Sequence, residues 1–232
     1  MSEKNSIKDG FVSQFILPPL WQVIPLGEGT EAAVDALITE QYRGLPRDKY
    51  GREMRRLRQV VLDAVLEFAD SGALEVIFPL GNYWGEPLSI AAVTAIGEPD
   101  EKVPPGLSDE DILKGLGVEL GGELVDTDAG RALRQVEVPD RPEAAASPDG
   151  EDGPGVGPLR TISYYWQIPG GHGATFTMTS TISGPYDPEL DPLVDAFAAL
   201  NDAMAQAMTW RPELLVESEV RPEASTPVES LS

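Results

Sequence analysis

The stretch LRTISYYWQIPGGHGATFTMTSTISGP, residues Leu159 to Pro185, decides the fold. Apolar and polar side chains alternate with period two on both sides of a glycine-rich centre, Pro169–Gly173, which is typical of a β-hairpin. Its glycines can take the positive φ angles that a turn needs. One face of the hairpin is apolar and the other is rich in hydroxyl groups, so we expect an antiparallel sheet with one face against helices and the other facing water. The alternating apolar residues are Ile162, Tyr164, Trp166, Ile168, Phe176, Met178 and Ile182.

Helical periodicity is clearest between Asp48 and Ser71, where apolar residues recur every three or four positions. Gly72 follows where a glycine commonly ends a helix. A first helix is expected after the candidate N-cap Thr30, and a last one begins at Asp187 or Asp191. The predicted helices span about 30–44, 48–71 and 187–208, with a short capped helix at 108–114 that the following glycines end.

Further β-strand patterns lie between these helices and around the main hairpin. Together they predict an α+β fold with an antiparallel sheet of about five to seven strands, packed on one face by two consecutive N-terminal helices and one C-terminal helix. We expect a single domain over residues 11–210. Segments poor in large apolar residues predict a disordered start at 1–10, a flexible acidic loop at 140–158 and a disordered acidic tail at 211–232. The predicted strands outside the main hairpin span 11–17, 20–26, 73–80, 88–96 and 131–138.

This order of elements resembles the Mog1/PsbP-like α/β sandwich, in which helices from both ends of the chain flank an antiparallel sheet. The segments that carry the resemblance are Leu20–Leu26, the hairpins Ala73–Ile96 and Leu159–Pro185, and the helix Leu193–Met208. The resemblance is one of element order alone. It implies a non-catalytic binding or accessory factor, and it transfers no functional residue to this chain.

Composition excludes several kinds of site. The chain has no cysteine and one histidine, which excludes disulfides, thiolate metal sites, a cysteine nucleophile and any site with two imidazoles. Its first residues lack an apolar signal core, and no apolar run approaches the roughly 18 residues of a membrane span. The net charge of −22 argues against binding to nucleic acid or to an anionic membrane surface. We therefore expect a cytoplasmic location.

The individual candidates for chemistry are weak. His172 lies in the glycine-rich turn, where a single histidine is usually solvated. Residues 126–130 have part of the spacing of a calcium loop, but Arg131 stands where that loop needs glycine. The acids at 109–111 suit the first turn of a helix, where they complement its dipole. We predict no catalytic, cofactor-binding or metal-binding residue.

An arginine-rich helix face at residues 47–58 is the strongest candidate for function. Seven of the 17 basic residues lie between Arg43 and Arg58 with only two acids among them. Helical spacing projects Arg52, Arg55 and Arg56 together, away from the apolar stripe of the same helix. Clustered guanidinium groups bind carboxylates or phosphates in bidentate fashion, although charge runs are commonly solvated surfaces.

An aromatic loop is the second candidate. Tyr83 and Trp84 lie at the tip of the expected hairpin, in the loop 81–87. Aromatic side chains on loops often anchor partner proteins, and they fold back onto the core about as often. Both alternatives stay open.

The sequence thus favours a non-catalytic cytoplasmic binding or accessory protein that acts through protein–protein contacts. The predicted partner is an unidentified protein, reached through the arginine-rich face, the aromatic loop or both. Two alternatives remain: a hydrolase that works with carboxylates alone on an unknown substrate, and an oligomerising structural subunit. No cofactor is predicted, and the pattern gives no oligomeric state.

Overall fold

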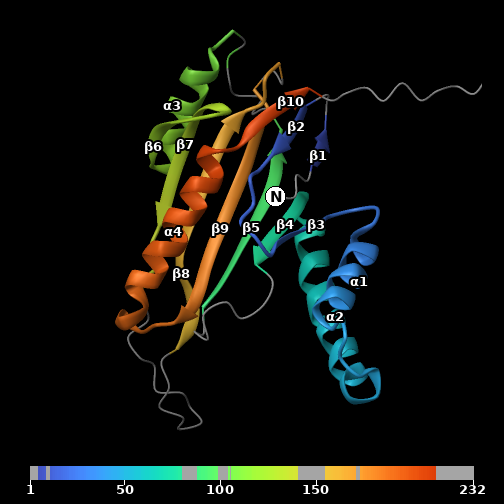
Figure 1. Cartoon of the computed structure of the whole chain (residues 1–232). Helices are drawn as coiled ribbons and strands as arrows, with labels where there is room; N and C mark the ends of the chain where they lie inside the picture. Colours follow the sequence, from blue (N-terminus) through green and yellow to red (C-terminus); the bar gives the residue numbers. More distant parts are fainter. Residues whose placement is uncertain are drawn as a thin grey trace, which may run out of the picture.

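A seven-stranded antiparallel sheet forms the centre of the molecule (Figure 1). The computed structural model describes residues 5–8, 11–79, 88–98, 104, 106–140, 155–170 and 173–212. The strand order is β3-β4-β5-β9-β8-β7-β6, so β3 and β6 lie at the two edges. The strands are β3 (Trp21–Pro25), β4 (Ala73–Pro79), β5 (Ser89–Gly97), β6 (Glu123–Thr127), β7 (Gly130–Glu137), β8 (Val156–Gln167) and β9 (Thr175–Pro185).

The hairpin β8–β9 has the alternation that the sequence predicts. Trp166 pairs with Phe176 and Tyr164 with Met178, and these four side chains are almost completely buried. Gly170 and Gly173 have positive φ angles at the turn, as their lack of a Cβ atom allows. His172 and Gly171 lie outside the described residues.

In the described part of the chain, four α-helices pack against the sheet, so the predicted α+β class is confirmed. They are α1 (Thr30–Gln41), α2 (Arg47–Asp70), α3 (Asp109–Leu120) and α4 (Asp191–Gln206), the last preceded by a 3₁₀ turn, η1 (Pro188–Leu190). Gly72 follows α2 with a positive φ angle, and the side chain of Ser108 accepts a hydrogen bond from the amide of Asp111.

The helix α3 is longer than its glycines indicate. The sequence predicts an end near residue 114, whereas α3 continues to Leu120 and includes Gly115 and Gly117. A Cβ atom at Gly117 would lie 3.1 Å from Leu133 Cδ1. The second glycine therefore lets α3 approach β7 closely, and this packing offsets its low helix propensity.

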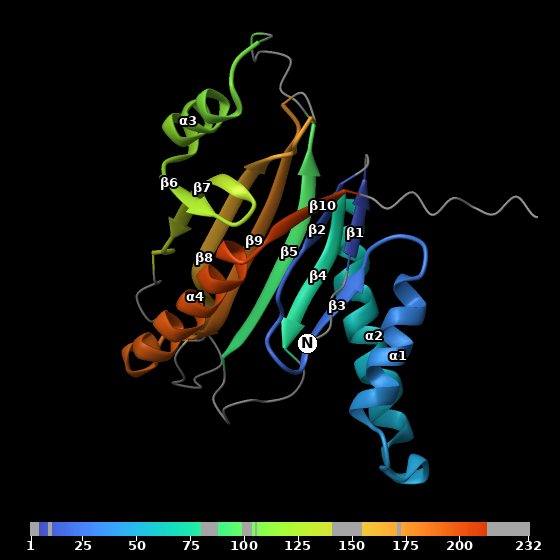
Figure 2. The ribbon, with the colours of Figure 1, turned by 45° about the horizontal axis from the view of Figure 1, so that its top comes forward.

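The helices cover both faces of the sheet, which differs from the expected packing on one face. Along β4, Ile77 belongs to the core beneath α4, while Val76 belongs to the core beneath α1 and α2. Adjacent strand residues point to opposite faces, so α4 lies on one face and the α1–α2 pair on the other. Figure 1 shows α4 lying across β8 and β9, whereas Figure 2 shows α1 and α2 beside β3 and β4.

A small second sheet joins the two ends of the chain. Its order is β1-β2-β10, with β1 at Asn5–Lys8, β2 at Phe11–Gln14 and β10 at Thr209–Pro212. The sequence predicts disorder over 1–10 and 211–232, so β1 and the end of β10 are unexpected elements. Of the residues predicted to be disordered, 1–4, 9–10, 141–154 and 213–232 lie outside the described residues. Val156–Pro158 of the expected flexible loop instead begin β8.

Candidate functional site

The helices α1 and α2 form an antiparallel pair whose connecting turn points away from the sheet in both views (Figures 1 and 2). Buried residues from both helices and from the sheet hold the pair together. Since α2 begins at Arg47, its first turns lie beside this connecting turn. The arginine-rich segment is thereby carried to the outer end of the helix pair. The buried residues of this core are Ile24, Val34, Leu37, Ile38, Leu62, Val65 and Val76.

Two arginines of the stretch Arg43–Arg58 form ion pairs with acidic residues of the same chain. Arg58 Nε donates to Asp35 Oδ1 at 2.5 Å, and Arg58 Nη2 lies 3.6 Å from Glu31 Oε2. The hydrogen bond from Arg58 lowers the pKa of Asp35. Arg43 forms an ion pair with Glu40, three residues earlier. Arg58 therefore joins α2 to α1.

Arg52, Arg55 and Arg56 differ from these two residues. All three are exposed, and none makes a hydrogen bond or ion pair with another residue in the part of the chain that the structure describes. Because successive helix residues turn by about 100°, the three side chains lie within about 100° of arc on one side of α2. We call these three residues the arginine face. Their role in docking a partner stays a prediction.

The predicted aromatic residues Tyr83 and Trp84 lie outside the described residues, as does the whole loop 81–87. Their role in binding a partner therefore stays a prediction.

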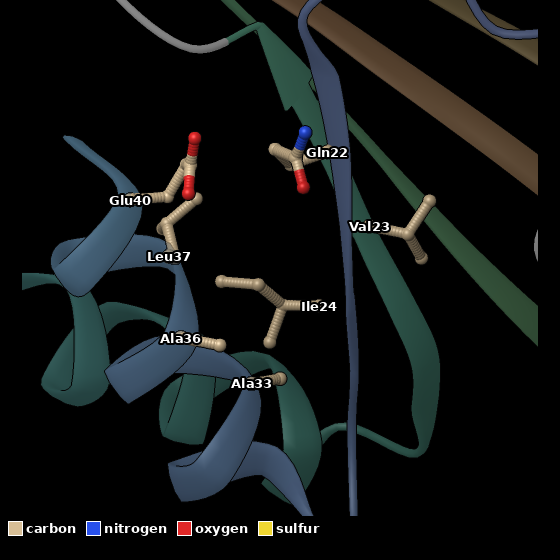
Figure 3. A pocket seen from close by; sticks show the side chains of 7 residues that line it. All are labelled: Gln22, Val23, Ile24, Ala33, Ala36, Leu37 and Glu40. Atoms are coloured by element: carbon tan, nitrogen blue, oxygen red, sulfur yellow. The ribbon is translucent and has the colours of Figure 1, made fainter. Parts of the chain in front are cut away.

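A groove between α1 and the edge strand β3 is a feature that the sequence did not indicate (Figure 3). Its volume is about 430 Å³. The side chains of Gln22 and Ile24 point toward α1, while that of Val23 points to the opposite face of β3. Val23 therefore lines the groove with its main chain. We call this feature the α1–β3 groove; its lining residues are Gln22, Val23, Ile24, Ala33, Ala36, Leu37 and Glu40.

A polar cluster lies under α4 on the other face of the sheet. Asp202 accepts hydrogen bonds from Arg134 and from the hydroxyl of Tyr164. The hydrogen bond to Asp202 raises the pKa of Arg134, and burial raises the pKa of Tyr164. These pKa shifts keep Arg134 charged and Tyr164 neutral. In these states both side chains donate hydrogen bonds to Asp202 and hold α4 against the sheet. We assign the cluster to stability.

Three of the acidic residues weighed in the sequence, Glu110, Asp111 and Asp126, have local partners. Asp126 accepts from Arg131 Nε at 3.0 Å, and Glu110 accepts from Lys114 Nζ at 2.9 Å. Asp111 accepts from the Ser108 hydroxyl. Within the described ranges, no group of three or more potential metal ligands gathers. Among the described helices, none has both the length and the apolar character needed to cross a membrane.

Comparison with known proteins gives no assignment. No family model, no curated protein and no solved structure matches this chain. The resemblance to the Mog1/PsbP-like sandwich is therefore still a prediction, and the function has to be argued from this chain's own surfaces.

Proposed function

We propose that this chain is a non-catalytic binding or accessory protein that acts through protein–protein contacts, with the arginine face as its docking surface. One observation supports the proposal. Arg52, Arg55 and Arg56 are exposed without a partner among the described residues, although the chain carries a net charge of −22. Arg43 and Arg58 show that such a chain readily pairs its own arginines.

The partner surface that fits best is an acidic one. Each guanidinium group can form two parallel hydrogen bonds with a carboxylate. Three exposed guanidinium groups on one side of α2 suit a partner surface with several carboxylates. The strongly negative net charge disfavours nucleic acid as the partner. The loop with Tyr83 and Trp84 remains a second docking element within the same proposal.

The proposed location is the cytoplasm. A cysteine-free chain needs no oxidising compartment.

Affinity capture from a lysate of the source cells, measured by quantitative mass spectrometry, tests the proposal. We expect the triple variant R52E/R55E/R56E to reduce capture of the principal partner by about tenfold or more, because it replaces attraction by repulsion at three contacts. Since all three side chains are exposed, the stability of the variant should change by only about 0.5 kcal/mol for each substitution.

The matched control is R52K/R55K/R56K, which keeps the charge and removes the bidentate geometry. We expect partial capture by this variant and weaker capture by all forms at high salt. Equal capture by the wild-type chain and the folded glutamate variant would exclude the arginine face as the docking surface.

A further inference from the structure

We propose that the α1–β3 groove binds an extended segment of a partner protein that carries alternating apolar and basic side chains. The segment forms main-chain hydrogen bonds with Val23 on the outer edge of β3 and places one apolar side chain in the groove. This site is separate from the arginine face and does not rest on the function proposed above.

The main-chain groups of β3 show where a segment can pair. The Leu26 amide donates to the Leu74 carbonyl at 2.8 Å, which defines a hydrogen-bonded pair in the β3–β4 register. Hydrogen-bonded and non-hydrogen-bonded pairs alternate along antiparallel strands. Gln22 and Ile24 therefore direct their main-chain groups toward β4, whereas Val23 directs its amide and carbonyl outward.

The neighbouring outward groups are mostly satisfied or absent. The Trp21 amide donates to the Pro18 carbonyl at 3.2 Å, and the Pro25 carbonyl accepts from the Thr30 hydroxyl at 3.0 Å. Pro25 has no amide hydrogen to donate. Among the described residues, Val23 alone therefore offers a complete donor and acceptor pair on the outward edge of β3, and a bound segment is held there over a short length.

The groove supplies the apolar contact that such a short pairing needs. Ile24 and Leu37 are buried and form its floor, while Ala33 and Ala36 leave space beside them because their side chains are small. Strand addition of this kind takes affinity from the main chain and specificity from pockets for alternate side chains. One apolar side chain of the partner segment fills the space beside the two alanines.

The charge at the groove selects a basic segment. Glu40 and Gln22 face each other across one end of the groove, and the lining residues include no cation (Figure 3). The Glu40 side chain is half exposed and has Arg43 as its ion-pair partner. A basic residue of the partner segment competes with Arg43 for this carboxylate, and the net charge of −22 adds a long-range attraction.

Titration of the full-length, isotope-labelled chain with the blocked hexapeptide Lys-Val-Lys-Val-Lys-Val, followed by NMR, tests the proposal. We expect chemical-shift changes at Val23, Ile24 and Ala36, together with slower amide exchange at Val23. A hexapeptide with N-methylated valines should lose both effects, because it cannot pair with a strand edge. A Lys-Ser hexapeptide of equal charge should bind several-fold more weakly than Lys-Val, since it lacks the apolar side chain.

Matched variants locate the binding. Ala36→Phe fills the groove and should weaken binding about tenfold, while Ala32→Phe, on the same helix and outside the lining, should leave it unchanged. Glu40→Gln should weaken binding about two- to fivefold, and Arg43→Gln should strengthen it by a similar factor.

Three results would overturn the proposal. One is no binding at millimolar peptide, and another is binding that Ala36→Phe and Ala32→Phe affect equally. The third is protection of the Val23 amide that rises with protein concentration in the absence of peptide, which would identify a second copy of this chain as the occupant.

Discussion

Arg134 on β7 and Asp202 on α4 form two parallel hydrogen bonds, from Nε to Oδ1 at 3.0 Å and from Nη2 to Oδ2 at 2.9 Å. Both side chains are about three-quarters buried, with exposed fractions of 22% and 25%. The Tyr164 hydroxyl donates to the same carboxylate at 2.8 Å. Three groups from separate elements therefore fix α4 against the sheet.

Asp202→Ala should lower the free energy of unfolding by about 2–3 kcal/mol, because Nε and Nη2 of Arg134 and the Tyr164 hydroxyl lose their acceptor in a partly buried place, and Arg134 keeps only the more exposed Glu123 among the described residues. Urea denaturation measures the change. The matched control is Asp195→Ala, which removes an acceptor 2.7 Å from Arg160 that is 67% exposed. Its effect should stay below about 1 kcal/mol. Equal effects of the two substitutions would contradict the structural role of the Asp202 cluster.

The raised pKa of Tyr164 predicts that the folded chain loses stability in alkali. Burial, followed by the hydrogen bond to Asp202, raises the pKa of its phenol above the usual value. Above about pH 10 the unfolded chain releases this proton while the folded chain keeps it, so the free energy of unfolding falls as the pH rises. Tyr164→Phe should reduce that slope by up to about 1.4 kcal/mol per pH unit. Urea denaturation of both forms across this pH range measures the difference, and identical slopes would count against the shift.

Replacement of Leu20 by glycine should stabilise the fold. It has a φ angle of 69° and is 63% exposed, in a turn closed by the hydrogen bond from the Trp21 amide to the Pro18 carbonyl. A left-handed conformation costs an ordinary residue about 1–2 kcal/mol, and glycine avoids most of this at an entropic cost of about 0.5–1 kcal/mol. Leu20→Gly should therefore raise the melting temperature slightly. Leu20→Val, which is β-branched, should lower it.

Substitution of glycine by alanine should have opposite effects on stability at two positions near α3. A Cβ atom at Gly122 would lie 2.6 Å from the Arg134 carbonyl oxygen, and its φ angle is 127°. Gly122→Ala should destabilise the fold by about 2 kcal/mol or more through clash and backbone strain. Gly115 lies inside α3, where a Cβ atom would meet open space, so Gly115→Ala should stabilise the fold by about 0.5–1 kcal/mol. Thermal denaturation of the two variants distinguishes them, and a shift in the same direction would refute the assignment.

Local patterns predict the elements whose signals lie within a few residues. The hairpin β8–β9 follows from its alternation, and α2 follows from its apolar stripe and Gly72. The strand β10 is not predicted because four residues carry too little pattern, and its pairing partner β2 lies near the other end of the chain. The face that each helix covers is not predicted either, since it depends on which side of β4 each core residue occupies.

The two candidate sites also differ in how far local sequence patterns predict them. The arginine face is predictable because charge density and helical spacing are local properties of residues 47–58. The α1–β3 groove is not predictable, because it requires β3 to be an edge strand, which only the complete strand order shows. That Arg58 is held by Asp35 likewise depends on the packing of α1 against α2.

The strand order also determines how the polypeptide reaches this structure. The strands β3, β4 and β5 come from the first half of the chain and β6 to β9 from the second, and β5 pairs with β9 where the halves meet. The Thr177 and Ser89 hydroxyls cross this boundary to carbonyl groups 82 and 94 residues away. Contacts between such distant residues form slowly because a long loop must close first. We therefore expect each half to collapse early and the β5–β9 boundary to set the folding rate.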